Sequence, residues 1–176
     1  VLERYARAGA NVTGIDITPR AIEICKQRFR HRGVSGEFVI GNAEELPFAD
    51  KSFDCVCSMG VLHHTPNTQK AVDEIHRVLK PGGLFVLMLY HRGSALYHFR
   101  FRMLSVLRRK SMKLMMNEYD GVGNPKGVAY TRREMRKLLS QYSRVEIFAG
   151  FIHGTHFLPL FGKFVPQAAF KPLAKR

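Results

Sequence analysis

Two short stretches of the sequence hold side chains suited to ligand binding and proton transfer. Asp16 ends the β-type run Asn11–Asp16, and a carboxylate at the carboxyl end of a parallel strand is where doubly wound folds hold the ribose hydroxyls of an adenosine cofactor. The other reading is an Asp that caps the following helix, but Thr18 already stands at the capping position. His63 and His64 follow a later apolar run. A histidine there is either a general base or a packed loop residue.

These side chains meet at one edge of a sheet only if strands and helices alternate along the chain. Capping residues and apolar runs predict, in order, helix Val1–Ala8, strand Asn11–Asp16, helix Pro19–Arg32, strand Glu37–Ile40, strand Phe53–Met59, a helix from Asn67 to Leu79 and strand Leu84–Tyr90. This order indicates an α/β fold with a doubly wound, Rossmann-like and mostly parallel sheet that has helices on both faces. The nearly continuous apolar run Leu84–Tyr90 is typical of a strand buried on both faces.

The stretch from Val1 to Tyr90 resembles the class I S-adenosylmethionine-dependent methyltransferases, in their small-molecule branch. Three segments carry the resemblance in this order and spacing: GIDITPRAIEICKQRF, GNAEELPFADKSFDCVCSMGVLHH and AVDEIHRVLKPGGLFVLM. The resemblance implies a Rossmann-like fold and S-adenosyl-L-methionine as the cofactor.

The resemblance also implies which residues hold the adenosine part of that cofactor. Asp16 would bind the ribose, and Ile17 would pack on the adenine. Asn42 and Ala43 would read the adenine edge through a side-chain oxygen and a backbone N–H. The family more often has Asp where Asn42 stands. Asn keeps the acceptor but loses the charge, so an altered affinity is expected.

A second group of residues is implied at the end of the strand Phe53–Met59. Ser58, Met59 and Gly60 would line the methionine part of the cofactor. His63 is the candidate catalytic base, since a base with a pKa near 7 helps when the acceptor is a hydroxyl or an acidic carbon. No metal ligands are expected.

The chain is expected to lack one part of such a fold. Folds of this kind carry a glycine-rich loop about 20 residues before the acidic ribose residue, and counting back from Asp16 places that loop before Val1. The chain would then be either a fragment without the first strand and its loop, or a degenerate protein. The fragment is favoured because Val1 falls inside a helix and the later motifs are intact. At the other end, Arg144–Ala149 reads as the first strand of a hairpin whose partner would follow Arg176.

All of the excess positive charge lies in the second half of the chain. The formal net charge is +14, and residues 75–176 hold nineteen Lys and Arg against four Asp and Glu, whereas residues 1–74 hold nine against ten. Ala95–Met116 can be wound as a helix with an apolar stripe, and 92–116 holds seven Lys and Arg and no acid. Peripheral contact with an anionic membrane is expected through 92–116. The alternative is a lid helix with its basic side in water.

One partial methyltransferase domain is predicted over 1–176. It comprises a cofactor-binding core at 1–90, an inserted basic helical region on the acceptor side at 91–143, and a terminal strand with an irregular basic tail at 144–176. Within the middle region, Thr131 and Glu134 form a capping box that predicts a helix through about Tyr142.

Composition narrows the class of protein further. A hydrophobic fraction of 45% with 13 Phe supports a packed core. The longest uncharged run, 147–162, contains His, Pro and Gly, which argues against a membrane span. The three cysteines, Cys25, Cys55 and Cys57, have no framework spacing, so a reducing, cytoplasmic setting is expected, peripheral to the membrane if 92–116 binds it. Cys55 and Cys57 are expected to be small core residues rather than metal ligands.

The leading functional expectation is transfer of a methyl group from S-adenosylmethionine to an O, N or C atom of a small or lipophilic acceptor. A nicotinamide-dependent oxidoreductase is the enzymatic rival, because Asp16 would serve both cofactors. From another class, the basic half would make this a non-catalytic membrane- or RNA-binding protein with a degenerate methyltransferase fold. Nucleic acid is the less favoured partner because an aromatic RNP-type strand is absent from the sequence.

Overall fold

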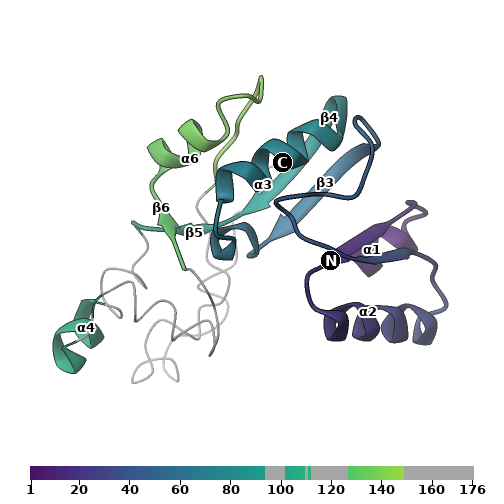
Figure 1. The fold of residues 1–176 in the computed structure, drawn as a ribbon, viewed down its shortest axis with the longest axis horizontal. Helices are drawn as coiled ribbons and strands as arrows, with labels where there is room; N and C mark the ends of the chain where they lie inside the picture. Colours follow the sequence, from purple (N-terminus) through teal and green to yellow (C-terminus); the bar gives the residue numbers. More distant parts are fainter. Residues whose placement is uncertain (94–101, 110, 112–126, 149–176) are drawn as a thin grey trace, which may run out of the picture. The chain divides into compact units, whose positions relative to one another are not determined.

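The computed structural model describes residues 1–93, 102–109, 111 and 127–148, and the chain forms two compact units, Val1–Leu89 and Tyr90–Arg176. The first unit contains α1 (Leu2–Arg7), β1 (Thr13–Asp16), α2 (Pro19–His31), β2 (Glu37–Ile40), β3 (Phe53–Met59), the 3₁₀ turn η1 (Leu62–His64), α3 (Thr68–Val78) and β4 (Leu79–Met88) (Figure 1). The second contains β5 (Tyr90–His91), α4 (Arg102–Arg108), β6 (Ala129–Tyr130) and α6 (Arg132–Leu138).

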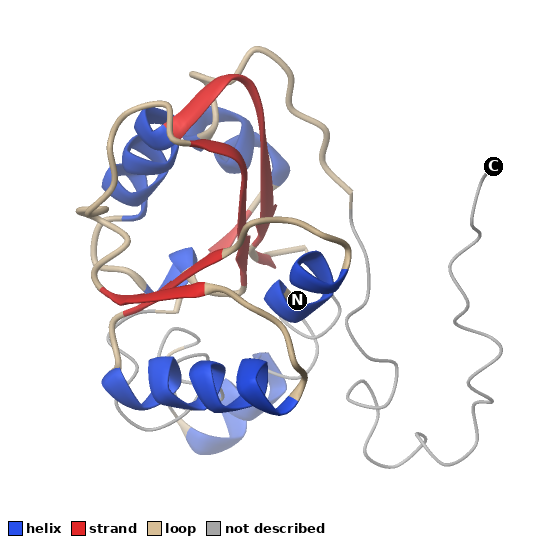
Figure 2. Cartoon of the chain, turned by 90° about the vertical axis from the view of Figure 1, so that its right-hand side faces the viewer, coloured by secondary structure: helices blue, strands red, loops and turns tan. Residues whose placement is uncertain are grey.

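Strands β1 and β2 form a parallel pair that α2 covers. Asp16 at the end of β1 lies opposite Ile40 at the end of β2. In α2, the buried Ile22 and Phe29 are seven residues apart and so lie on one face of the helix. Phe29 packs edge-on against Phe38 of β2, with ring centroids 4.8 Å apart, and Figure 2 shows α2 lying alongside the two strands.

Strands β3 and β4 form a second parallel pair, and α3 packs against β4. The helix begins where Asn67 caps it, since the Asn67 side chain accepts a hydrogen bond from the Lys70 N–H at 3.1 Å. Besides Thr68, α3 buries four apolar residues that share one face at this spacing: Ala71, Val72, Ile75 and Val78. The pairs β1–β2 and β3–β4 are separate two-stranded sheets among the described residues. Strands alternating with helices in parallel pairs confirm the predicted α/β class.

Strand β4 starts earlier than the sequence predicted. It begins at Leu79 rather than Leu84, and its pairing with β3 shifts register between Phe53 and Cys55. Gly83 sits in that irregular segment, where a Cβ atom would lie 2.8 Å from the Lys80 carbonyl oxygen. The Lys80–Gly83 stretch lies between the predicted helix and the predicted strand, and it contains Pro and Gly, which disfavour regular strands. In the structure these residues form the irregular step between two paired segments, since Leu79 pairs with Phe53 and the pairing resumes at Leu84, opposite Cys55.

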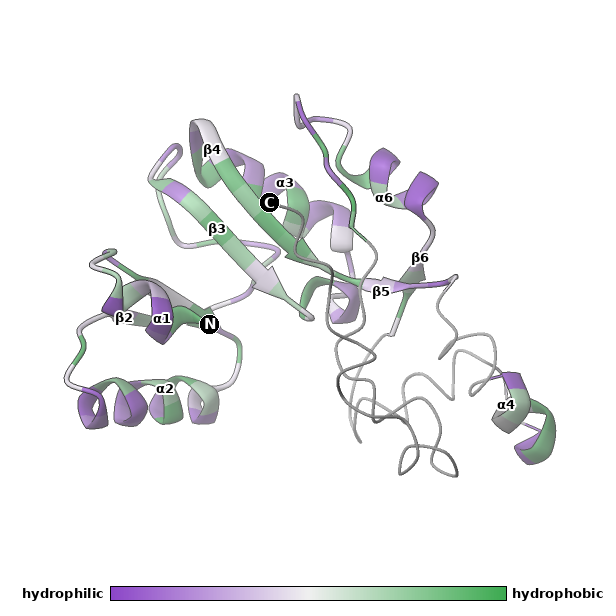
Figure 3. Cartoon of the chain, turned by 180° about the vertical axis from the view of Figure 1, so that it is seen from behind, coloured by the Kyte–Doolittle hydropathy of each residue, from purple (hydrophilic) through white to green (hydrophobic). Residues whose placement is uncertain are grey.

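The predicted burial of the strand Leu84–Tyr90 on both faces is wrong, because one face of the β3–β4 pair is exposed. Leu84 is 59% exposed, Met59 is 46% exposed, and Cys55 and Cys57 are exposed as well. Cys55 lies opposite Leu84 in the register, so these side chains share one face of the pair. Ser58 on the alternate face is buried. The prediction that Cys55 and Cys57 are core residues is therefore wrong. Much of β3 and β4 is nevertheless made of hydrophobic residues, as the colours of Figure 3 show.

In the second unit, β5 pairs in parallel with β6 and α6 follows. The predicted capping box of α6 is confirmed. The Thr131 hydroxyl accepts from the Glu134 N–H at 3.2 Å, and the Glu134 carboxylate accepts from the Thr131 N–H at 2.7 Å. The helix ends at Leu138, short of the predicted Tyr142.

The predicted strand Arg144–Ala149 is wrong over residues 144–148, which form no strand pairing. Their exposure does alternate as in a strand, but a strand also needs a neighbour for its backbone, and the described residues supply none. Of the predicted helix Ala95–Met116, the structure describes α4, which ends at Arg108, and the helix prediction is wrong at Arg109, whose φ is +51°, and at Ser111. The rest of that prediction lies outside the described residues, as do Ala149 and the tail 150–176.

Candidate functional site

The carboxyl ends of β1 and β2 bring Asp16 and the start of the β2–β3 loop (Gly41–Ser52) together. The Gly41 N–H donates to the Asp16 carbonyl oxygen at 3.0 Å, which continues the parallel pairing by one residue. Asp16 is exposed, and the neighbouring Ile17 is 67% exposed. A carboxylate and an apolar side chain thus face solvent at the edge where doubly wound folds bind ligands.

The side chain of Asp16 also orders the start of α2, which corrects the sequence argument about Thr18. Thr18 occupies the N-cap position, but its side chain makes no capping hydrogen bond. Instead, the Thr18 hydroxyl and N–H both donate to Asp16 Oδ1, at 2.7 and 2.9 Å. An ionised carboxylate has a second acceptor oxygen, so this local turn fixes the orientation of Asp16 and leaves Oδ2 for a ligand hydroxyl.

Asn42 and Ala43 stand at the beginning of the β2–β3 loop. Asn42 is exposed and Ala43 is half-buried. Asn42 Oδ1 accepts from the Glu44 N–H at 3.0 Å, which folds the loop back in a short turn. An amide oxygen has two lone pairs and the amide nitrogen two donors. The Asn42 side chain can therefore keep this turn and still bond to the edge of a base.

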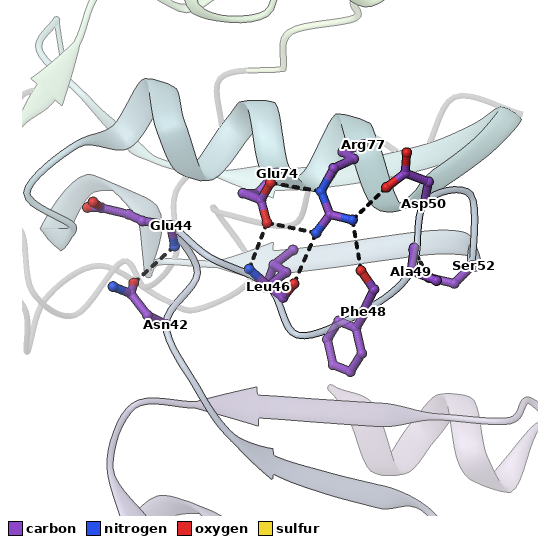
Figure 4. Close-up of polar contacts among 9 residues, drawn as sticks. All are labelled: Asn42, Glu44, Leu46, Phe48, Ala49, Asp50, Ser52, Glu74 and Arg77. Carbon is purple, nitrogen blue, oxygen red and sulfur yellow. Dashed lines mark hydrogen bonds and ion pairs between the residues drawn. The ribbon is translucent and has the colours of Figure 1, made fainter.

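An ionic cluster on α3 holds the remainder of the β2–β3 loop, and no local pattern in the sequence indicates it (Figure 4). The Arg77 guanidinium donates to the Glu74 carboxylate through Nε and Nη2, each at 2.8 Å. It also donates to the Phe48 carbonyl at 2.8 Å, the Leu46 carbonyl at 3.0 Å and Asp50 Oδ1 at 2.8 Å. Glu74 Oε2 in turn accepts from the Leu46 N–H at 2.8 Å.

The end of β3 carries Ser58, Met59 and Gly60. Ser58 is buried, Met59 is exposed, and the Gly60 N–H donates to the Met88 carbonyl at 3.1 Å. Gly60 has φ +77°, a left-handed conformation that favours glycine, and a Cβ there would lie 3.2 Å from Met88 Cε. The strand thus ends in a turn that only glycine adopts without strain.

His63 is buried in η1, with no exposed surface. Its ring centroid lies 3.8 Å from that of His64, which is half-buried. Burial, and secondarily the charge of His64, lowers the pKa of His63 to about 4. The imidazole is therefore neutral at pH 7, and it is a weaker base than an imidazole whose pKa lies near 7.

Hydrogen bonds connect two of these groups. Asp16 and Asn42 meet through Gly41, and Glu44 Oε1 accepts from the Asn67 N–H at 2.6 Å. The Glu44 carboxylate thereby joins the loop to the segment that follows the histidines. Among the described residues, no group of three or more His, Cys, Asp or Glu is arranged to hold a metal ion. No helix in the described part of the chain has the length and apolar character to cross a membrane.

Comparison with known families matches residues 1–87 to the family described as methyltransferase domain. With the parallel α/β fold and the carboxyl-edge site, this places the chain in the class I S-adenosylmethionine-dependent methyltransferases, through that segment. The resemblance seen in the sequence is confirmed.

Several curated proteins are similar over part of the chain. The phthiotriol/phenolphthiotriol dimycocerosates methyltransferase of Mycobacterium tuberculosis is 43% identical over 76 residues, which are 43% of this chain and 27% of that protein. The sterol 4-C-methyltransferase of Caenorhabditis elegans is 38% identical over 89 residues, 49% of this chain and 27% of that protein. The chain thus matches about a quarter of the length of these relatives.

Solved structures extend the likeness to more of the chain. A SAM-dependent methyltransferase of Methanosarcina mazei is 27% identical with a TM-score of 0.60, covering 78% of this chain and 71% of that one. A putative methyltransferase of Bacillus halodurans is 25% identical with a TM-score of 0.56, covering 75% and 52%. The Rossmann-like fold predicted from the sequence is confirmed.

Proposed function

We propose that this protein transfers a methyl group from S-adenosylmethionine to a small, lipophilic acceptor. The observation that carries the proposal is the exposed Asp16 carboxylate, held beside Asn42 by the hydrogen bond between Gly41 and Asp16 at the carboxyl edge of a parallel strand pair. The match of residues 1–87 to the methyltransferase domain family supports the binding of S-adenosylmethionine at that edge.

The residues present fit the adenosine part of the cofactor by their chemistry. The Asp16 carboxylate accepts hydrogen bonds from the ribose hydroxyls, and the exposed Ile17 side chain offers an apolar surface to the base. Asn42 and Ala43 bond to the adenine edge. Ser58, Met59 and Gly60 line the methionine part, a role taken from the family resemblance.

S-adenosylmethionine supplies an activated methyl group when bound, so the protein mainly has to align the acceptor. Alignment alone accounts for about 7 to 11 kcal/mol of barrier in well-oriented reactions. The base role of His63 remains a proposal: the neutral ring accepts a proton at pH 7, and its lowered pKa makes the transfer less favourable than for an ordinary imidazole.

The lipophilic acceptor is inferred from the names of the relatives. One is named for dimycocerosates and another for a sterol. These names support an apolar acceptor class and leave its structure open.

The function is tested by titrating the chain, and any longer form of the protein that carries it, with S-adenosylhomocysteine and with NADH. Isotope-edited NMR is suitable because it measures weak binding as well as tight binding. We expect S-adenosylhomocysteine to bind and to shift the amide signals of Asp16, Gly41 and Ala43, whereas NADH leaves them in place. The opposite ligand order would favour the nicotinamide reading, and silence toward S-adenosylhomocysteine at millimolar concentration in every form would contradict the proposal.

We further propose that the basic region 92–116 touches an anionic membrane surface where the acceptor resides. In α4 the apolar residues Met103, Val106 and Leu107 are 48, 74 and 71% exposed, and they lie on neighbouring positions of the helix surface. Arg102 and Arg108 are exposed on the same helix. An exposed apolar sector flanked by arginines is suited to an anionic lipid interface.

Replacing the arginines of α4 is expected to reduce vesicle binding. Each basic residue near an anionic surface contributes about 1 kcal/mol, so Arg102→Gln combined with Arg108→Gln should weaken co-sedimentation with anionic liposomes by more than about tenfold. Arg132→Gln with Arg133→Gln on α6 is the matched control and should have a smaller effect. Equal binding to neutral and anionic vesicles, or binding unaffected by salt, would contradict the proposal.

A further inference from the structure

The β2–β3 loop is attached to α3 at alternate residues. Glu44 accepts from the N-cap residue Asn67, and Leu46 bonds to both Glu74 and Arg77. Further along the loop, Arg77 also holds the Phe48 carbonyl and Asp50 Oδ1. Together, Glu74 and Arg77 form what we call the α3 clamp (Figure 4).

The α3 clamp is stronger than a surface ion pair of the same charge. The Glu74 and Arg77 side chains retain 20% and 32% of their accessible surface, and Leu46 between them is buried. Two parallel bonds join the guanidinium to the carboxylate, a geometry that fixes direction as well as distance. The hydrogen bonds from Arg77 lower the pKa of Glu74, so the carboxylate stays ionised at neutral pH.

The clamp leaves Asn42 and Ala43 between two fixed points. On one side the Gly41 N–H is bonded to the Asp16 carbonyl, and on the other Glu44 is bonded to Asn67. Beyond Glu44, the α3 clamp holds the loop at Leu46. The position of the Asn42 oxygen and the Ala43 N–H is thus determined by side chains about 30 residues later in the sequence.

We propose that Glu74 and Arg77 are positioning residues that set the preference of this site for adenine. The inference rests on the proposed function, in which Asn42 and Ala43 bond to the adenine edge. A base edge is recognised only when its partners are held to within about 0.5 Å. A released loop still leaves Asp16 for the ribose, so the nucleoside binds but its base is read poorly.

The matched pair of ligands is S-adenosylhomocysteine and S-inosylhomocysteine. Adenine presents an amino donor and a ring-nitrogen acceptor, and hypoxanthine presents an oxygen acceptor and an N–H donor at the same positions. The measured quantity is the ratio of the two dissociation constants, determined by NMR titration. For the unaltered protein we expect a preference for the adenine ligand of about tenfold or more.

Arg77→Gln and Glu74→Gln are expected to bring this ratio to within about threefold of one. Arg77→Lys keeps the charge but not the paired donors, and should restore little of the preference. Lys80→Gln is the control, because the Lys80–Asp54 ion pair, at 2.8 Å, joins β4 to β3 without touching the loop. Hydrogen exchange of the Leu46 amide should accelerate in Glu74→Gln and stay unchanged in Lys80→Gln.

The outcomes separate the inference from the function on which it rests. If Arg77→Gln weakens both ligands equally, so that the ratio is kept, the α3 clamp is merely structural and the inference is overturned. Unchanged exchange of the Leu46 amide in Glu74→Gln would overturn it too. If the unaltered protein binds both ligands equally, the loop does not read the base, although the cofactor proposal survives. Failure to bind either ligand, in this chain and in every longer form that carries it, would overturn both.

Discussion

The protein is expected to lose about 3 kcal/mol of stability through His63 as the pH falls from 7 toward 4. In the folded chain the pKa of His63 is about 4, whereas an exposed histidine in the unfolded chain has a pKa near 6.5. Between these values the unfolded state binds more protons, so the free energy of unfolding falls as the pH falls through about 6.5. The loss levels off below about pH 4, where the folded state becomes protonated as well. Urea unfolding at pH steps from 7.5 to 4.5 measures it.

The non-titrating variant His63→Gln should flatten this slope between pH 5 and 7, where few carboxylates titrate. His64→Gln is the control and should retain most of the slope, because burial, the larger cause of the lowered pKa of His63, is kept in this variant. The variant His63→Gln is expected to be less stable at pH 7, since it changes a buried side chain, but the comparison uses the slope rather than the level. An identical slope in both variants would show that His63 is accessible to protons in the folded state.

The substitution Asp16→Ala is expected to weaken the binding of S-adenosylhomocysteine by about 10- to 150-fold. The reason is the loss of a charge-assisted hydrogen bond to the ribose, which contributes about 1.5 to 3 kcal/mol. Calorimetric or NMR titration of the two proteins gives the ratio of dissociation constants. The loss should appear in cofactor affinity rather than in the rate of the bound complex.

Asp16 also accepts two hydrogen bonds from Thr18, so a control must separate the two roles. Thr18→Ala removes the hydroxyl donor and leaves the Asp16 carboxylate in place. It should change the affinity by much less than Asp16→Ala. Equal effects of the two substitutions would mean that Asp16 acts by ordering the start of α2, and an unchanged affinity in Asp16→Ala would remove the residue from the site.

Local signals in the sequence predicted most elements of the first unit. The bounds of β2 and β3 agree with the structure, and α2 and α3 agree to within a residue at each end. Proline at the first turn of α2 and the caps at Asn67 and Thr131 act over three or four residues, so they can be read without knowledge of the fold. The same holds for the family motifs, which indicated the candidate site residues.

Strand pairing and burial were predicted less well, because each depends on a segment elsewhere in the chain. Residues 144–148 have a strand-like pattern but no pairing among the described residues, and Leu84 has an apolar neighbourhood in sequence but an exposed position in space. Whether an apolar residue is buried depends on what packs against its face, and periodicity alone does not contain that information.

The sequence by itself determined the class of fold and most of the elements that end at the candidate site, and it proposed the residues of that site. Only the tertiary structure decided how those residues are held: the burial that lowers the pKa of His63, the turn between Asp16 and Thr18, and the α3 clamp on the loop. Helix caps and strand runs act through neighbours along the chain, whereas Arg77 meets the Leu46 carbonyl across a separation of 31 residues. Contacts of that range form only when the packing of α3 brings the two segments together. The sequence around either residue therefore does not indicate which residue it will contact.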